Sequence, residues 1–162
     1  MKKFSIIAIL AMAIIISSYS IKSPLSNPNP PTTNTGAPTL SRTCVRCHGD
    51  FTLNTAGGSI TATGLPVGSY VPGQVYNFSV TITNATPMQV WAFAMKAVVS
   101  GISGTALGTF STTNANVNLS AGEIRNTNGA VFTGTSYTYN NLSWTAPSTG
   151  TSNVSFYVAG VA

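Results

Sequence analysis

The order of hydrophobic and polar residues after Gly58 is typical of a β-protein. Residues 75–83 alternate between apolar and polar side chains, which predicts a strand with one buried and one exposed face. Residues 89–99 are apolar at nearly every position, and such a run predicts a central strand that is covered on both sides. The side chains expected on the buried face of the first strand are those of Tyr76, Phe78, Val80 and Ile82.

Two further strands complete the prediction. Residues 137–144 and 153–160 have a similar β-type pattern, and Asn128-Gly129 fits the two-residue turn of a hairpin. No stretch after residue 50 repeats its apolar residues with a helical period over two or more turns. The sequence therefore predicts an all-β fold, an immunoglobulin-like antiparallel β-sandwich over residues 58–162, preceded by a short segment at 41–57.

Residues 1–20 predict an export signal. Lys2 and Lys3 precede an apolar run over residues 4–16, and serines dominate the four residues after it. The run is shorter than a membrane span needs, so we expect a cleaved signal and no membrane span in the mature chain. The expected location is the periplasm, the cell surface or the extracellular space.

The segment that follows the signal is rich in proline. Residues 21–40 carry five of the nine prolines and have no apolar period. Proline fixes φ and removes an N–H donor, so this stretch predicts an extended, polyproline-like linker. After Pro38, residues 39–48 fit one or two turns of helix, which Gly49 would end in the left-handed conformation.

Charged residues are sparse. Loss of Lys2 and Lys3 with the signal lowers the formal net charge by two, from +5 to +3. The basic residues that remain form no patch of the kind that binds nucleic acid. The two acids are Asp50 and Glu123, too few for positioned acid–base chemistry. We therefore expect neither an enzyme nor a nucleic-acid partner.

Cys44, Cys47 and His48 form a C-x-x-C-H motif that contains both cysteines and the only histidine of the chain. This spacing fits covalent haem attachment, in which the thiols add to the two vinyl groups as thioethers and the adjacent histidine becomes the proximal iron ligand. Attachment occurs outside the cytoplasmic membrane, where the export signal would bring the chain. We predict one covalent haem c, with Arg42 and Arg46 either near its propionates or simply exposed.

Two other uses of the motif stay open. Paired cysteines in an exported protein also suit a disulfide between Cys44 and Cys47, with His48 incidental. A zinc site would need a fourth ligand, for which Asp50 is the only nearby residue. A thioredoxin-like redox pair is not expected, because that motif belongs in a βαβ setting that this sequence lacks.

The sixth iron ligand of such a haem could not be a histidine of this chain. Met88 and Met95 are the thioether candidates in the mature chain, and Lys96, water or a residue of another chain are further ones. Met95 shares a strand face with Trp91 and Phe93, which favours core packing, whereas Met88 lies in an expected turn. Methionine would raise the reduction potential, and an open position would favour binding of a small ligand.

Several pieces of the chain resemble a known family. The stretch NTGAPTLSRTCVRCHGD is similar to the start of secreted bacterial proteins called choice-of-anchor V proteins, in which a C-x-x-C-H segment precedes a β-domain. The β-domain resembles the reeler (reelin-type) domain in the pieces GSYVPGQVYNFSVTIT, VWAFAMKAV and LSWTAPSTGTSNVSFYVAG. The resemblance covers roughly residues 35–160.

This resemblance implies an immunoglobulin-like sandwich, export, and a cytochrome-like haem motif at Cys44, Cys47 and His48. Reeler-like domains often carry a histidine shortly before the WTAP strand, where this chain reads SYTYNNLSW, so a family-type histidine ligand is not expected. Many relatives continue into a C-terminal anchor region, and we expect none after Ala162.

Together these observations predict an exported monohaem c-type cytochrome-like protein that transfers electrons in the periplasm or at the cell surface. Its redox partner is not indicated by the sequence. The alternative is a non-catalytic secreted adhesion or matrix β-module with a Cys44–Cys47 disulfide. A haem-dependent sensor of small gases is a third hypothesis, and assembly at the cell surface or in a matrix is compatible with each.

Overall fold

The computed structural model describes residues 30–38, 42–49, 52–100, 105–127, 130–150 and 153–162. Among these residues no helix is long and apolar enough to cross a membrane. The predicted signal and the Asn128-Gly129 turn lie outside the described residues. The elements are a 3-10 turn η1 (Cys44–Arg46) and the strands β1 (Gly58–Thr63), β2 (Val75–Val99), β3 (Thr109–Thr112), β4 (Val117–Ser120), β5 (Glu123–Asn126), β6 (Ala130–Thr145) and β7 (Val154–Val161).

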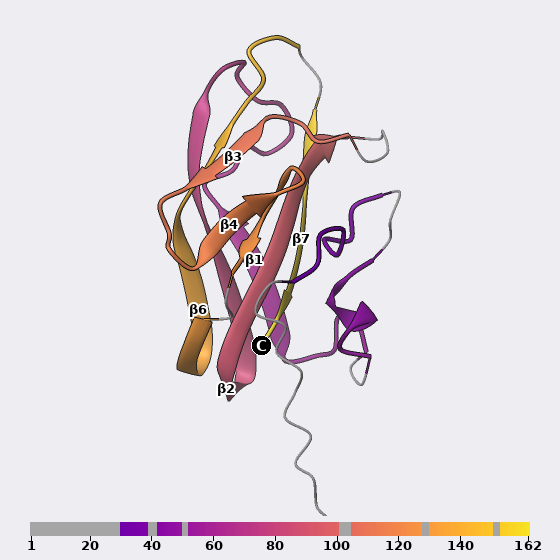
Figure 1. Ribbon diagram of the computed structural model, residues 1–162, viewed down its shortest axis with the longest axis vertical. Helices are drawn as coiled ribbons and strands as arrows, with labels where there is room; N and C mark the ends of the chain where they lie inside the picture. The colour runs from indigo at the N-terminus through magenta and orange to yellow at the C-terminus, as the bar shows by residue number, and fades with distance from the viewer. Residues whose placement is uncertain (1–29, 39–41, 50–51, 101–104, 128–129, 151–152) are drawn as a thin grey trace, which may run out of the picture.

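The strands form two antiparallel sheets that share β2. In sheet A, the first part of β2 pairs with β1 and β6, and β6 pairs with β3, which gives the order β1-β2-β6-β3. In sheet B, the second part of β2 pairs with β5 and β7, and β5 pairs with β4, which gives the order β4-β5-β2-β7. Figure 1 shows β2 running the length of the molecule. The predicted all-β antiparallel sandwich is confirmed.

The two strands predicted at 75–83 and 89–99 are one continuous strand in the structure. Its pairing with β6 shifts register between Thr83 and Met88 and again between Met88 and Val90, where β2 passes from one sheet to the other. Such irregularities bend a strand and increase its twist. The sequence between the two runs holds Pro87, which predicted a turn; the bend accommodates it within the strand instead.

The core lies between the sheets and is dominated by aromatic side chains. Of the face predicted for the first part of β2, Phe78, Val80 and Ile82 are buried and Tyr76 is half-buried. In the second part, Trp91 and Phe93 are buried with relative exposures of at most 1%. Rings from different segments meet in the core: the Phe93 and Tyr139 ring centroids are 4.7 Å apart, and Tyr70, between β1 and β2, meets Trp144 of β6 edge-on at 5.6 Å.

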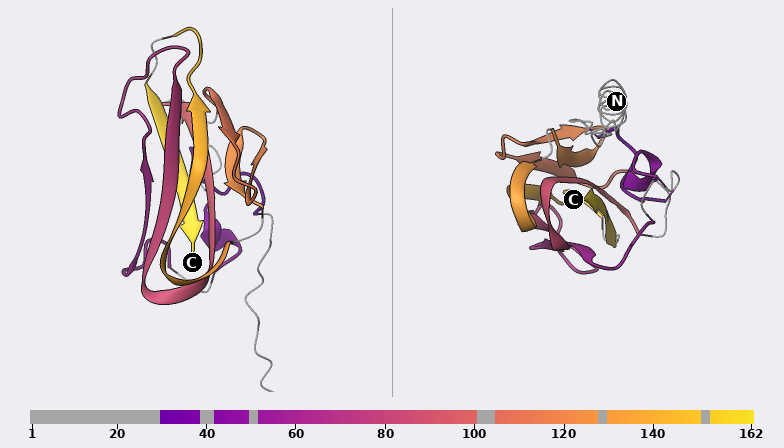
Figure 2. Two further views of the ribbon diagram at one scale, coloured as in Figure 1. Left: turned by 90° about the vertical axis from the view of Figure 1, so that its left-hand side faces the viewer. Right: turned by 90° about the horizontal axis from the view of Figure 1, so that it is seen from below.

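The two open sides of the sandwich differ. On one side the edge strands β3 and β4 contact each other. On the other side lie the edges of β1 and β7, and every residue of β7 after Val154 is only half-buried. Figures 1 and 2 show the N-terminal segment, drawn in indigo and purple, standing beside the β7 side of the sandwich. The incompletely buried side of β7 lines the cavity that is described below as the candidate site.

Tyr139 provides a test of the core. Its buried hydroxyl donates to the Trp91 carbonyl over 2.6 Å and accepts the Ala130 N–H at 3.3 Å, so it ties β6 to the crossing region of β2. Burial also raises the pKa of Tyr139 to about 12. Tyr139→Phe leaves the carbonyl and the N–H unpaired, and we expect a loss of about 1–3 kcal/mol in the free energy of unfolding, measured by denaturant titration.

The matched control is Tyr137→Phe, on the same face of β6. Its hydroxyl makes no hydrogen bond within the described part of the chain, so a change below about 0.5 kcal/mol is expected. Equal losses in both variants would contradict the role given to the Tyr139 hydroxyl.

Candidate functional site

The C-x-x-C-H motif forms a single tight turn. The Cys47 and His48 N–H groups both donate to the Cys44 carbonyl, at 3.1 and 3.0 Å, and the Arg46 N–H donates to the Thr43 carbonyl at 3.1 Å. The helical turn predicted over 39–48 is therefore present as η1 and the two residues after it, while residues 39–41 lie outside the described part. The left-handed conformation predicted for Gly49 is wrong, because its φ is not positive. These hydrogen bonds fix the spacing of the two thiols and the imidazole along the turn.

A cavity of about 700 Å³ separates this turn from the sandwich. Cys44 and His48 line it from the turn, and Thr35 and Gly36 line it from the segment that precedes the turn. The opposite wall is made by β1, β2 and β7. The residues of that wall that matter most are Ile60, Met88, Phe156 and Val158. The cavity thus lies along the half-buried strand β7, in the seam left between β1 and β7.

The far wall of the cavity is largely apolar, although Ser59, Thr83 and Asn84 also belong to it. Ile60, Phe156 and Val158 pack against the core on one side, and their remaining surface faces the cavity. At Gly160 the two strands come close together, because a Cβ there would lie 2.7 Å from Ile60 Cδ1. A Cβ at this position would displace the end of the Ile60 side chain and would lie 3.1 Å from the Ala92 carbonyl oxygen, so glycine allows Ile60 to pack closely on β7.

The residues present fit a haem attached at this turn. Cys44 and Cys47 are free thiols, as thioether formation requires, and His48 lines the cavity with Cys44. Cys47 is exposed and is not part of the cavity lining, so it lies at the rim. A large planar apolar group needs an apolar wall and a nitrogen ligand, and the cavity offers both.

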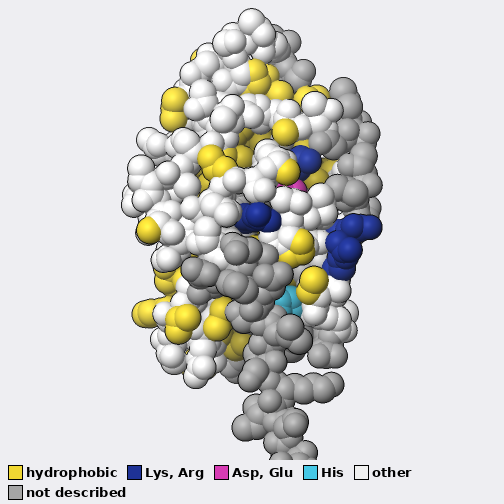
Figure 3. All heavy atoms as spheres, in the orientation of Figure 1, with side chains coloured by type: hydrophobic (Ala, Val, Ile, Leu, Met, Phe, Trp, Pro, Cys, Tyr) yellow, Lys and Arg dark blue, Asp and Glu magenta, His cyan; other side chains and the backbone are white. Residues whose placement is uncertain are grey.

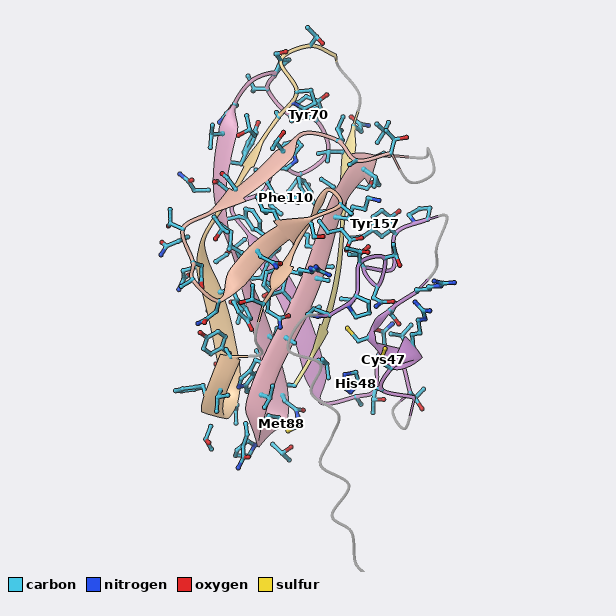
Figure 4. All side chains as sticks on the ribbon, in the orientation of Figure 1. Cys47, His48, Tyr70, Met88, Phe110 and Tyr157 are labelled. Atoms are coloured by element: carbon cyan, nitrogen blue, oxygen red, sulfur yellow. The ribbon has the colours of Figure 1, made fainter. Side chains whose placement is uncertain are left out.

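The two methionines occupy different environments. Met88 is half-buried and lines the cavity, and Figure 4 shows it at the same end of the molecule as His48. Met95 has a relative exposure of 0% and lies in the core opposite Ile124 of β5. The structure therefore brings Met88 to the motif and leaves Met95 among the core residues. The role of either as an iron ligand stays a prediction.

The charged residues near the motif are peripheral. Arg42 and Arg46 are exposed, and Lys96 of β2 stands opposite Glu123 of β5, away from the cavity lining. Figure 3 shows the few Lys and Arg side chains of this face spread over its middle and right, above the histidine. Within the described ranges, no three His, Cys, Asp or Glu side chains converge as a metal ion would need. The zinc alternative depends on Asp50, which lies outside those ranges.

Some cavity residues were not found from the sequence. The strand at 153–160 was predicted, but nothing in its pattern said that Phe156 and Val158 face an incompletely filled seam. Thr35 and Gly36 were placed in a linker, whereas Thr35 is buried in the structure, with an exposure of 3%. Outside the cavity lining, Glu123 is buried, with an exposure of 1%, which the sequence did not predict. The only signal for Glu123 was the rarity of acids in this chain.

Similarity of this chain to known proteins is found among solved structures. No protein-family model matches the chain, and no curated protein matches it. Two structures of the human F-spondin reeler domain are similar to it, at 22% and 21% identity with TM-scores of 0.45 and 0.47. They cover 64% and 66% of this chain and 74% and 79% of theirs. A structure of the Reelin-N domain of F-spondin, at 20% identity and TM-score 0.47, covers 69% of this chain and 78% of its own.

At these TM-scores and identities the similarities assign no family to the chain. They say nothing about the C-x-x-C-H turn or about what the cavity holds. The predicted segment boundaries at residues 20, 40 and 57 stay predictions.

The two thiols should differ in reactivity. Burial raises the pKa of Cys44 to about 11, with the neighbouring Cys47 adding to the rise and a backbone hydrogen bond opposing it. Because only the thiolate is alkylated, we expect iodoacetamide at pH 8 to label Cys47 at least about tenfold faster than Cys44 in the haem-free protein. Peptide mass mapping over time measures both rates. Urea-unfolded protein is the control, and equal rates in the folded chain would contradict this geometry.

Proposed function

We propose that the protein is an exported c-type haem protein in which the cavity beside β7 accommodates one covalently attached haem. The observation that carries the proposal is that Cys44 and His48 of the turn line one cavity together with Met88, which is far from them in sequence, and that the far wall of this cavity is largely apolar. The export signal predicted from residues 1–20 would take the chain to the compartment where haem is attached.

Each residue has a distinct part in this proposal. Cys44 and Cys47 would add their S–H bonds across the two vinyl groups, and His48 would donate an imidazole nitrogen to the iron. Bound haem would supply a one-electron couple, or a place for a small ligand. Ile60, Phe156 and Val158 would exclude water from one face, because their side chains form an apolar wall.

The proposed role is electron transfer and not catalysis. The titratable side chains that line the cavity in the described part of the chain are those of Cys44, His48 and Tyr157, and in this proposal Cys44 and His48 hold the haem and do not act as an acid and a base. Sparse charge also means that a redox partner would meet a largely uncharged surface, so its docking would depend little on ionic strength.

Haem attachment is tested by expressing the chain together with a c-type haem-attachment system. We expect the intact mass to rise by one haem and the reduced protein to show a c-type α-band. Cys44→Ala/Cys47→Ala is the matched control, since it removes both thioethers and should show neither signal. A wild-type protein that leaves this system without added mass would contradict the proposal.

The sixth ligand is tested with paired methionine variants. Met88→Leu removes the thioether that lines the cavity, so we expect the low-spin spectrum to be lost and the reduction potential to fall. Met95→Leu, a conservative change in the core, should leave the spectrum as in the wild type. If the iron of the reduced wild type is already five-coordinate and its absorption spectrum shifts when carbon monoxide is added, Met88 is not a ligand. This result would favour the hypothesis of a haem-dependent sensor of small gases.

A second candidate function is a non-catalytic adhesion or matrix module, and it rests on the outer face of sheet A. Hydroxyl groups pair across all four strands of this face, as in Ser59–Thr83 at 2.7 Å, Thr81–Thr138 at 3.0 Å and Ser111–Ser143 at 2.7 Å. The described Lys, Arg and Glu residues lie outside these strand pairs. An uncharged hydroxyl surface of this kind suits contact with a neutral polar polymer.

The same intact-mass measurement separates the two candidates. The second one includes a Cys44–Cys47 disulfide, which lowers the mass by two hydrogens and blocks haem attachment. In the structure both thiols are free.

A further inference from the structure

A strap of residues 30–37 connects the sandwich to the motif. Asn34 and Thr35 are buried in it, with exposures of 4% and 3%, although the sequence around them predicts an extended linker. Asn34 Nδ2 donates to the Pro31 carbonyl at 3.2 Å, and the Ala37 N–H donates to Thr35 Oγ1 at 3.4 Å. The strap is thus a defined structure that packs on the sandwich.

A buried carboxylate holds the strap. Both oxygens of Glu123 accept the Thr33 N–H, at 2.9 and 3.1 Å, and the Arg125 guanidinium donates to the Pro30 carbonyl. Glu123 and Arg125 lie on β5 on the face opposite to the core residue Ile124, so the strap crosses the outer face of sheet B. No other acid of the described chain is available for this role, because Glu123 is the only one.

The charges around Glu123 explain how it is tolerated there. Lys96 of β2 stands opposite it in the sheet, and Arg125 lies on its own strand. Burial raises the pKa of Glu123, while the Thr33 N–H and then the two cations lower it. A buried carboxylate is retained at modest cost only when donors and opposite charges surround it in this way.

The strap reaches the motif through Gly36. The Gly36 N–H donates to the Arg42 carbonyl at 2.8 Å, two residues before Cys44. Gly36 has φ of +78°, and a Cβ at this position would lie 3.4 Å from Thr43 Cγ2, so the strap and the turn are in close contact here. Thr35 and Gly36 also line the cavity with Cys44 and His48.

We propose that Glu123 is a positioning residue for the cavity: by fixing the strap, it fixes the turn that carries Cys44 and His48. The consequence for haem binding rests on the proposed function, whereas the effect of Glu123 on the position of the turn does not. Without the anchor at Thr33, the strap would be free to leave sheet B, and the Gly36–Arg42 hydrogen bond that orients the turn would go with it.

The experiment measures amide hydrogen exchange by NMR in the haem-free chain as exported, wild type against Glu123→Gln. Glutamine keeps one acceptor oxygen but loses the charge between two cations. We expect exchange at Thr33, Gly36, Cys47 and His48 to become faster by about tenfold, the effect of losing one charge-assisted hydrogen bond. Faster exchange at Thr33 alone would overturn the proposal, since the effect would then stop at the local bond.

Two further variants keep the test decisive. Arg125→Met removes the donor to the Pro30 carbonyl and should give the same pattern if Glu123→Gln does not fold. Thr112→Val is the matched control on β3, because its hydroxyl also makes two hydrogen bonds, to the Asn141 carbonyl and from the Asn114 N–H, far from the strap. It should leave exchange at Gly36 and His48 unchanged; an equal rise there would overturn the proposal.

A spectroscopic readout links the strap to the haem. After maturation with haem, Glu123→Gln should show altered axial-ligand bands and Thr112→Val should match the wild type. Identical bands in all three proteins, together with unchanged exchange at His48, would overturn the positioning role. If no variant takes up haem, the proposed function fails, and the exchange pattern of the haem-free chain still decides whether Glu123 positions the turn.

Discussion

The structure depends on one strand that belongs to two sheets. β2 (Val75–Val99) pairs with β1 and β6 in its first part and with β5 and β7 in its second. Because the backbone of β2 continues from one sheet into the other, the sheets are held together at the irregular region around Met88. That crossing leaves β1 and β7 as neighbouring edges with a seam between them. The seam exposes one side of β7, and the N-terminal segment packs over it to form the cavity.

This arrangement explains why the motif stands next to a β-domain. The turn at Cys44–Arg46 has no core of its own, and a segment of this length cannot enclose a macrocycle alone. The sandwich supplies the missing wall through Ile60, Phe156 and Val158. The strap supplies the connection, since Glu123 holds one end of it and Gly36 meets the turn at the other. Sandwich, strap and turn therefore form one site, although they were predicted as separate segments.

The sequence predicted the local features well. Alternation around Phe78 and Val80 identified a half-buried strand, and the residues between Pro38 and Gly49 indicated the turn, because both predictions depend on neighbouring residues. It did not predict that β2 is continuous, since Pro87 between the two apolar runs suggested a turn. It also could not show that Glu123 is buried or that Met88 and His48 face one cavity. The burial of Glu123 and the shared cavity of Met88 and His48 depend on contacts between segments that are far apart in sequence. A pattern of neighbouring residues gives no information about such contacts.

We propose that the cavity beside β7 holds haem iron next to His48. Crystals of the protein matured with haem, measured on both sides of the iron absorption edge, locate that atom directly by anomalous difference density. We expect a single iron peak inside the cavity, between the turn and the wall formed by Phe156 and Val158. No iron peak, or one outside the cavity and away from His48, would contradict it.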